Sequence, residues 1–281
     1  MCTIAILIGV ADAPVVVAAN RDELYARPTR PPELLAPGIA GGVDAQSGGT
    51  WLAINANGRF AAVTNQRALD TPPPGLRSRG LAVKELAAAA DQDAYVAALD
   101  PRGYASMNLV WGDATNVSIA YLRRETGDKE IIALSRGIHV LCNDRVGACG
   151  FPRGERLAAA IESALGRPWP ELSRSLMTAL GDHTRVPLED TPPSHLPIEV
   201  ANALTSTCIH AEIYGTRSST ILALEPGQPG LQRSSFGSPG QPGLQRSSFG
   251  SPGRVAAYLH ADGPPCVTPF VDKAGLLERA A

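Results

Sequence analysis

The chain opens with MCTIAILIGVADAPVVVAANRDE (residues 1–23), and this stretch decides the fold. Two apolar runs, 4–10 and 15–19, flank a short turn at 11–14, which is the pattern of a β-hairpin. In an antiparallel pair joined by a short turn, the end of the second strand lies beside the start of the first. We therefore expect the charged segment 20–23 to lie close to Cys2.

The position of Cys2 suggests chemistry. Because its side chain is small, we expect Met1 to be removed, which would leave one residue with both a thiol and a free α-amine. These groups have ordinary pKa values of about 8.5 and about 7.7–8.0, so the thiol can act as nucleophile and the amine as its base. A nearby carboxylate could hold the amine, and a guanidinium could lower the pKa of the thiol. The alternative is a solvated charge cluster where a strand enters a loop.

Composition excludes several classes of function. The chain has 281 residues, of which 44% are hydrophobic, and this is enough for a substantial core. The net charge of −2 gives no basic footprint for a nucleic acid. No segment approaches the roughly 20 apolar residues of a membrane span, and no basic residue precedes Ile4 as in a signal peptide. We therefore expect a cytoplasmic protein without a nucleic-acid partner or stable membrane insertion.

The five cysteines are widely spaced, at Cys2, Cys142, Cys149, Cys208 and Cys266. Their odd number and the absence of a C-x-x-C pair argue against a disulfide framework and against a zinc site. We expect reduced thiols, with Cys142, Cys149 and Cys208 as small core residues. The histidines share no spacing, so the sequence predicts no metal site and no cofactor.

Strand and helix patterns come in blocks. The proline-rich stretch 27–42 is expected to be an ordered loop or lid over the hairpin. We expect further strands over 51–54, 59–64, 107–111, 117–123, 130–135, 139–142, 208–214 and 218–224, and helices over 80–90, 91–99, 153–165 and 169–180. Hairpin runs of strands alternating with helices predict an α+β fold of two antiparallel sheets packed face to face, with the helices outside.

A tandem repeat lies near the end of the chain. Residues 227–239 recur unchanged at 240–252. Two copies are too few for a solenoid, so we interpret them as a duplicated hairpin insert, or an artefact of the sequence, in a single domain over 1–281. One copy of its LQRSSF segment is expected to pair with the strand at 220–224. The other copy should loop out, since doubling a loop costs only about 0.6 kcal/mol.

An ordered set of motifs resembles the NRDE family, also called the transport and Golgi organisation 2 family. The motifs are MCT at 1–3, NRDE at 20–23, GGTWL at 48–52, GRFAAVTN at 58–65, NLV at 108–110, LCN at 141–143 and YGTR at 214–217. The resemblance implies a four-layer αββα sandwich like that of the N-terminal nucleophile (Ntn) hydrolases. It also implies a distant similarity to penicillin V acylases and bile-salt hydrolases.

The resemblance further implies catalytic roles. Cys2 would be the nucleophile, and Asp22 the aspartate that contacts its thiol and amine. Asn65 and Asn143 resemble the oxyanion asparagine and the second site asparagine of bile-salt hydrolases, although either could be a turn residue. Arg217 is a looser match to an active-site arginine.

Three further residues, Asn20, Arg21 and Trp51, are expected to contact the substrate, although Trp51 could also be a core residue. The distant hydrolases carry arginine three positions before the aspartate, where this chain has Ala19. Here Arg21 is adjacent to the aspartate, and adjacent residues of a strand point to opposite faces. Either Arg21 and Asp22 do not both face Cys2, or Arg217 supplies the active-site arginine.

Two functions fit this sequence. The first is a cysteine Ntn hydrolase that cleaves a non-peptide C–N (amide) bond in a small acylated substrate. The second follows from the links of the resembled family to haem handling and lipid metabolism. It is a non-catalytic protein that binds and traffics haem or a lipid on the same scaffold.

Overall fold

The predicted N-terminal hairpin lies in the middle of a six-stranded sheet. β1 (Cys2–Ile8) and β2 (Val15–Leu24) pair antiparallel with Cys2 opposite Arg21, which confirms that segment 20–23 returns to Cys2. The computed structural model describes residues 2–67, 73–227 and 253–278. Within them this sheet has the order β10–β1–β2–β11–β12–β13, completed by β10 (Gly137–Leu141), β11 (Tyr214–Glu225), β12 (Arg254–Ala261) and β13 (Val271–Asp272).

The second sheet is a meander in which every strand pairs with its neighbour in sequence. Its seven strands follow the order β3 to β9. They are β3 (Thr29–Ala36), β4 (Ile39–Asp44), β5 (Leu52–Asn55), β6 (Phe60–Asn65), β7 (Met107–Gly112), β8 (Val117–Arg123) and β9 (Asp128–Ala133). The connections are short except between β6 and β7, where residues 66–106 include two helices.

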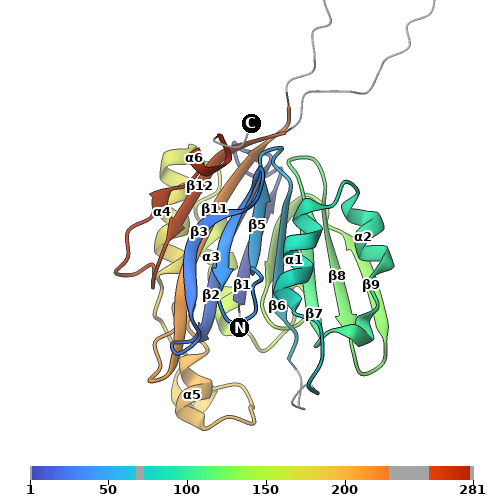
Figure 1. Ribbon diagram of the computed structural model, residues 1–281. Coiled ribbons are helices and arrows are strands. Elements are labelled where there is room, and N and C mark those ends of the chain that lie inside the picture. Colours follow the sequence, from blue (N-terminus) through green and yellow to red (C-terminus); the bar gives the residue numbers. More distant parts are fainter. Residues whose placement is uncertain (1, 68–72, 228–252, 279–281) are drawn as a thin grey trace, which may run out of the picture.

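Helices cover the outer face of each sheet (Figure 1). The second sheet carries α1 (Arg79–Ala88) and α2 (Gln92–Ala98), and the first carries α3 (Pro152–Glu162) and α4 (Trp169–Leu180). The short elements are 3₁₀ turns at Pro101–Gly103 and Leu188–Asp190, α5 (Ile198–Ala203) and α6 (Gly275–Glu278). The predicted α+β sandwich with four αββα layers is therefore confirmed. No helix in the described part of the chain is both long and apolar enough to cross a membrane.

Alternation along β1 separates two cores. Ile4 and Ile6 face the opposite sheet, whereas Ala5 and Leu7 pack against the layer of α3 and α4. Because side chains alternate along a strand, Cys2 shares the face of Ile4 and points between the sheets. The register of the hairpin places Arg21 on that same face.

The predicted loop or lid over 27–42 is wrong. These residues form β3 and β4, which pair from Thr29 with Asp44 to Ala36 with Ile39. Proline cannot donate a ladder hydrogen bond, but β3 is the edge strand of its sheet, where Pro31 and Pro32 are tolerated.

The predicted strand over 208–214 is also wrong. Segment 214–217 is not a turn between two strands, because β11 begins at Tyr214 and pairs with the end of β2. Residues before it are held by other contacts: the Cys208 N–H donates to the Asp182 carbonyl at 2.8 Å, and the Ile209 N–H donates to Thr216 Oγ1 at 2.9 Å.

The repeat at 227–252 lies, from residue 228 on, outside the described residues, and so does the predicted pairing of its LQRSSF segment. In the described part, the strand from Thr220 to Leu224 has a partner on each side. β2 pairs along one edge and β12 along the other. The two neighbours of this strand are thus the hairpin and the segment that follows the repeat.

Candidate active site

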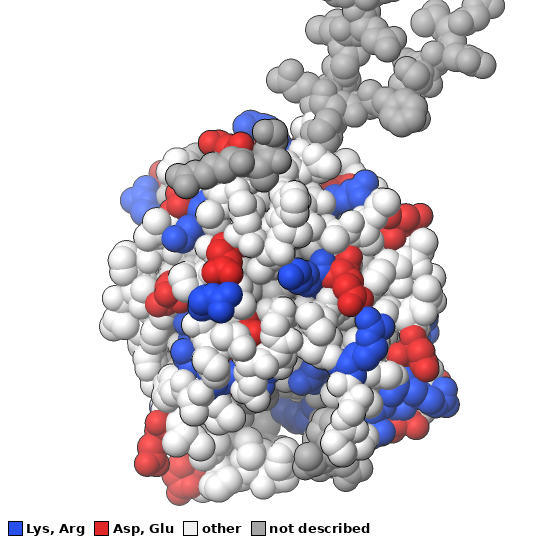
Figure 2. Space-filling model, viewed as in Figure 1, with Lys and Arg blue, Asp and Glu red and all other residues white. Residues whose placement is uncertain are grey.

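A cavity of about 330 Å³ opens where the hairpin meets the second sheet. Its lining comes from the start of β1, the end of β2, the end of β6 and the segment that leads into α1. Figure 2 shows a hollow near the lower edge of this face, close to where Figure 1 places the start of β1, with basic side chains beside it. The polar ends of the central strands therefore converge on one concave site.

Cys2 lies in this lining and is half-buried. Burial raises the pKa of its thiol, and the Asp22 carboxylate raises it further. The Arg21 guanidinium and the backbone N–H of Asp22 act in the opposite direction and lower this pKa. Since the net shift is upward, the thiol needs a base to become a nucleophile at neutral pH.

Arg21 lies beside Cys2 in a partly stacked position. Its Cζ atom is 4.3 Å from the centroid of the Trp51 ring, and its Nη2 atom is 3.9 Å from a carboxylate oxygen of Glu23. Its Nη1 atom is buried and has no hydrogen-bond partner among the described residues. Trp51 thus orients a guanidinium that keeps an unused donor at the cavity.

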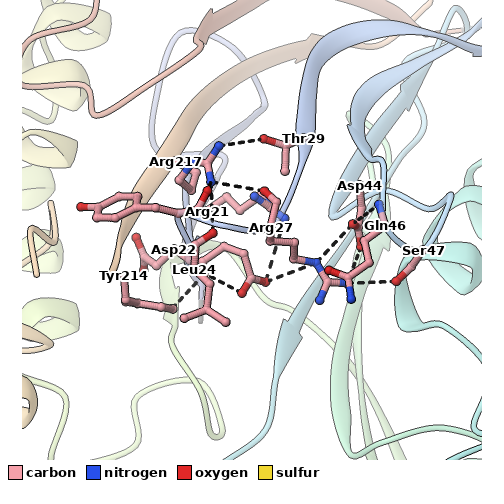
Figure 3. A network of polar contacts seen from close by, with 12 residues as sticks. Arg21, Asp22, Leu24, Arg27, Thr29, Asp44, Gln46, Ser47, Tyr214 and Arg217 are labelled. Carbon is pink, nitrogen blue, oxygen red and sulfur yellow. Dashed lines mark hydrogen bonds and ion pairs between the residues drawn. The ribbon is translucent and has the colours of Figure 1, made fainter. Parts of the chain in front are cut away.

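The side chain of Asp22 lies on the opposite face of β2 from that of Arg21, as the alternation along a strand predicts. Its Oδ1 atom accepts a hydrogen bond at 2.7 Å from Thr216, the residue directly across the ladder on β11. The Tyr214 hydroxyl donates to the Asp22 backbone carbonyl at 2.8 Å (Figure 3). Burial raises the pKa of Asp22, and the positive charge of Arg153 opposes this shift. Asp22 acts on Cys2 through its backbone and its charge. The side chain of Arg21, in contrast, lies on the same face of the sheet as the Cys2 thiol.

Asn65 ends β6 and lines the cavity. No hydrogen bond to its side-chain amide is found within the described residues, so the amide can donate to a bound molecule. Asn143, in contrast, is only 2% exposed and is not part of the lining. Its Nδ2 atom donates to the Asn65 carbonyl at 2.8 Å, and its Oδ1 atom accepts from Arg153 at 2.6 Å. Asn143 therefore positions Asn65.

Two other candidates lie away from the cavity. The Nδ2 atom of Asn20 donates to the carbonyls of Leu180 and Thr207, which joins β2 to the outer layer. Arg217 sits in a bulge of β11 and donates to the carbonyls of Leu24 and Tyr25 at 3.0 and 2.8 Å (Figure 3). Neither residue lines the cavity. Of the residues predicted for the site, the structure brings together Cys2, Arg21, Asp22, Trp51 and Asn65.

Arg79 is a site residue that the sequence analysis missed. It is the first residue of α1, lines the cavity and is close enough to Cys2 to interact with its charge. Its Nη1 atom donates to the Ser106 carbonyl at 3.3 Å. Burial lowers the pKa of this guanidinium. An arginine just inside a helix start is ordinary in sequence, and only the fold brings it to Cys2.

The other two arginines of the lining are neutralised by carboxylates. Arg27 pairs with Asp44 at 2.6 Å, as Figure 3 shows, and Arg77 pairs with Glu85 at 3.0 Å. Neither Arg21 nor Arg79 donates a hydrogen bond to a carboxylate among the described residues. Arg21 has only the long 3.9 Å contact with Glu23, and Arg79 has no carboxylate partner within the described part of the chain. Among the described residues, the group of His, Cys, Asp or Glu side chains close enough together to hold a metal ion lies around Cys208, outside this lining.

Comparison with known sequences finds one family, both in the family model and in the related proteins. The family model described as Transport and Golgi organisation 2 matches residues 1–228. The mouse protein described as Transport and Golgi organization 2 homolog is 28% identical over 230 residues, which cover 75% of this chain and 82% of that protein. The human protein described as Transport and Golgi organization protein 2 homolog is 28% identical over 231 residues, with the same coverage of each chain.

Comparison with solved structures finds more distant similarity. One is the Caenorhabditis elegans ortholog of N-acylethanolamine-hydrolyzing acid amidase, with a TM-score of 0.48 and 10% identity over 79% of this chain and 92% of that one. Another is the C2A mutant of conjugated bile acid hydrolase from Clostridium perfringens. It has a TM-score of 0.49 and 11% identity over 98% of this chain and 93% of that one.

Proposed function

The chain belongs to the Transport and Golgi organisation 2 family, and from the chemistry of its site we propose a cysteine hydrolase that cleaves the amide bond of a small acylated substrate. One observation carries this proposal. A thiol at position 2 and the side-chain amide of Asn65, which makes no hydrogen bond with another described residue, line one cavity beside two arginines. This set contains a nucleophile, a neutral donor for an oxyanion and cations for a polar substrate.

The reaction requires removal of Met1, so that Cys2 carries the free α-amine. The amine then takes the thiol proton as Cys2 Sγ attacks the substrate carbonyl carbon. When the C–N bond breaks, the same proton passes to the leaving amine and a thioester remains on Cys2. Water attacks the thioester, the carboxylic acid is released, and the thiol is restored. The raised pKa of the buried thiol is the reason that this step needs the amine as a base.

The side chain of Asn65 is suited to the oxyanion of both tetrahedral intermediates. Its amide makes no hydrogen bond with another described residue, while its backbone is fixed by Asn143. A donor that is held in place and unused in the free protein needs little reorganisation when charge develops.

The arginines indicate the kind of substrate. Arg21 keeps an unpaired Nη1 atom, and Arg79 keeps a guanidinium without a carboxylate partner among the described residues. Burying such cations is costly unless an anion binds them, and arginine recognises carboxylates with paired donors. We therefore assign the substrate an anionic group, such as the carboxylate of an N-acyl amino acid.

The haem or lipid function remains a prediction of the sequence. The described lining contains no histidine to ligate haem, and its character is set by arginines and carboxylates. A lipid chain would need a more apolar lining, because binding sites for apolar ligands are mostly hydrophobic.

The experiment starts from the intact mass of the purified protein. We expect Met1 to be absent and Cys2 to react with a mild alkylating agent in peptide mapping. A panel of N-acyl amino acids is then assayed for amine release. Cys2→Ala should abolish release with an unchanged melting temperature, and the exposed-cysteine variant Cys149→Ala should keep it.

Two results would overturn the proposal: retention of Met1 in active protein, or full activity of Cys2→Ala. A parallel haem titration tests the other function. Saturable haem binding that Cys2→Ala leaves unchanged, with no amine release from any substrate, would favour a binding protein.

A further inference from the structure

Four metal-binding side chains meet outside the cavity, at the start of β11. They are His183, Cys208, His210 and Cys266, and one ligand atom from each lies within 4.8 Å of the ligand atoms of all the others. Cys208 is buried, Cys266 is half-buried, and the two histidines are exposed. Two thiols and two imidazoles form a donor set that zinc commonly takes in structural sites.

The three distances among Cys208, His210 and Cys266 match a tetrahedral centre. Zn–S bonds of about 2.3 Å and Zn–N bonds of about 2.0–2.1 Å place two sulfurs about 3.8 Å apart and a sulfur and a nitrogen about 3.6 Å apart. The two Sγ atoms are 3.7 Å apart. His210 Nε2 lies 3.6 Å from Cys208 Sγ and 3.3 Å from Cys266 Sγ. The His183 and His210 rings are 4.9 Å apart between centroids.

The geometry does not fit a disulfide. A disulfide requires an S–S distance of about 2.05 Å, whereas these sulfurs are 3.7 Å apart and both cysteines are free. At this spacing one ion beside the pair could bind both sulfurs. His210 Nε2 lies within 3.6 Å of both sulfurs, which a simple thiol contact would not require.

Three segments that are distant in sequence build this group. His183 follows α4, Cys208 and His210 precede β11, and Cys266 lies between β12 and β13. The Cys208 N–H bond to the Asp182 carbonyl joins the first two segments. A Cβ built on Gly181 would lie 3.4 Å from the backbone of Cys266, which shows how closely the third approaches. The wide spacing explains why the sequence predicted no zinc site.

The backbone beside the group is also fixed, because Arg185 Nη2 donates to the His210 carbonyl at 3.1 Å. Two thiolates would balance the charge of a divalent ion.

We propose that His183, Cys208, His210 and Cys266 form a structural zinc site that fastens the 262–270 loop to the junction between α4 and β11. All four positions of the tetrahedron come from the protein, which is the mark of a structural rather than a catalytic zinc. The site stabilises the segment that enters β11, and β11 in turn positions Thr216 against Asp22. The proposal is independent of the hydrolase reaction.

The test measures metal binding by the full chain, reduced and without an affinity tag. Cobalt(II) is titrated as a probe, because thiolate ligation gives charge-transfer bands and tetrahedral ligand-field bands, and zinc is then added to displace it. We expect one cobalt ion per chain. Cys266→Ser and His210→Ala should each weaken binding about tenfold or more. The matched controls Cys149→Ser and His195→Ala, at exposed positions outside the group, should bind as the parent does.

Several results would overturn this site. One is the absence of cobalt–thiolate bands in the reduced protein, and another is binding that Cys266→Ser leaves unchanged. A third is a Cys208–Cys266 disulfide in protein kept under reducing conditions, detected by peptide mass. Cys266→Ser is the decisive variant because this residue is only half-buried, so the substitution should leave the fold intact. Melting temperature before and after chelation gives a second readout, and zinc should raise it.

Discussion

The Nδ2 atom of Asn143 donates to the backbone carbonyl of Asn65 at 2.8 Å, so one predicted site residue holds the other in place. The two asparagines looked equivalent in sequence, since each follows a strand. In the fold, the Asn65 amide lines the cavity without a hydrogen bond to another described residue, whereas the Asn143 amide is buried and hydrogen-bonded through both its nitrogen and its oxygen. Substituting each of them should therefore give different results.

Asn65→Ala should lower kcat for amide hydrolysis by about 10²–10³-fold, the usual loss when one oxyanion donor is removed. Its melting temperature should stay near that of the parent, because the side chain makes no hydrogen bond with a described residue. Steady-state kinetics and thermal unfolding measure the two effects. Asn57→Ala, in the exposed turn between β5 and β6, is the control. A large loss of stability with normal kcat would contradict the assigned role.

Asn143→Ala should instead destabilise the protein. It removes the hydrogen bond to the Asn65 carbonyl and leaves the buried Arg153 without its 2.6 Å acceptor. Loss of a partner for a buried polar group costs about 1–3 kcal/mol. Urea unfolding of the variant and the parent gives this difference directly. Equal unfolding midpoints would show that the contact contributes little.

The reactivity of Cys2 should depend on its two charged neighbours in opposite directions. Arg21 lowers the pKa of the thiol and Asp22 raises it. Arg21→Gln should move the pH midpoint of Cys2 alkylation upward, and Asp22→Asn should move it downward. Peptide mapping after timed alkylation at several pH values isolates Cys2 from the other thiols. If both variants shifted the midpoint in the same direction, the electrostatic account of the site would fail.

Arg79 and its neighbour Arg77 should differ in their contribution to binding an anionic substrate. Arg79→Gln should raise KM for an N-acyl amino acid about tenfold or more, because a charge-assisted hydrogen bond contributes about 1.5–3 kcal/mol. Arg77→Gln should change KM little, since that exposed guanidinium pairs with Glu85. The uncharged amide of the same substrate provides a second control. Equal losses in both variants would place the anion elsewhere.

The fold was largely predictable because period-2 patterns and turn residues are local. The hairpin 2–24 and the pair β5 and β6 follow from such signals. The expectation that Cys149 is a core residue was wrong, because it is exposed. The two errors in strand assignment came from position in the sheet. The prolines in 27–42 led to the prediction of a loop, because an edge strand, which tolerates proline, cannot be recognised without knowledge of its partner strands. Tyr214 begins a strand because β2 lies beside it.

The site was harder to predict because it depends on contacts between distant segments. Cys2, Arg21 and Asp22 came together through one hairpin register, which the sequence specifies. Arg79 carried no local signal. The group around Cys208 was missed for the same reason, since its ligands come from three separated segments. Spacing rules detect metal sites only when the ligands are close in sequence.

His260 should make stability depend on pH. It is 2% exposed on β12, its Nδ1 atom is 2.9 Å from Thr220 Oγ1, and burial with nearby Lys273 lowers its pKa from 6.5 to about 4. Between these values the unfolded chain binds a proton that the folded chain does not. The free energy of unfolding should therefore fall as pH drops from about 6.5 to about 4, by up to about 3 kcal/mol.

Urea unfolding across this pH range tests the effect of His260 against His260→Gln, which keeps a hydrogen-bonding side chain but cannot titrate. The absolute stability of the variant does not matter, since the comparison is between slopes. The parent should lose stability more steeply than the variant from about pH 6.5 to about pH 4, and the slopes should agree at higher pH. Parallel curves over the whole range would mean that His260 takes up its proton equally well in the folded and unfolded chain.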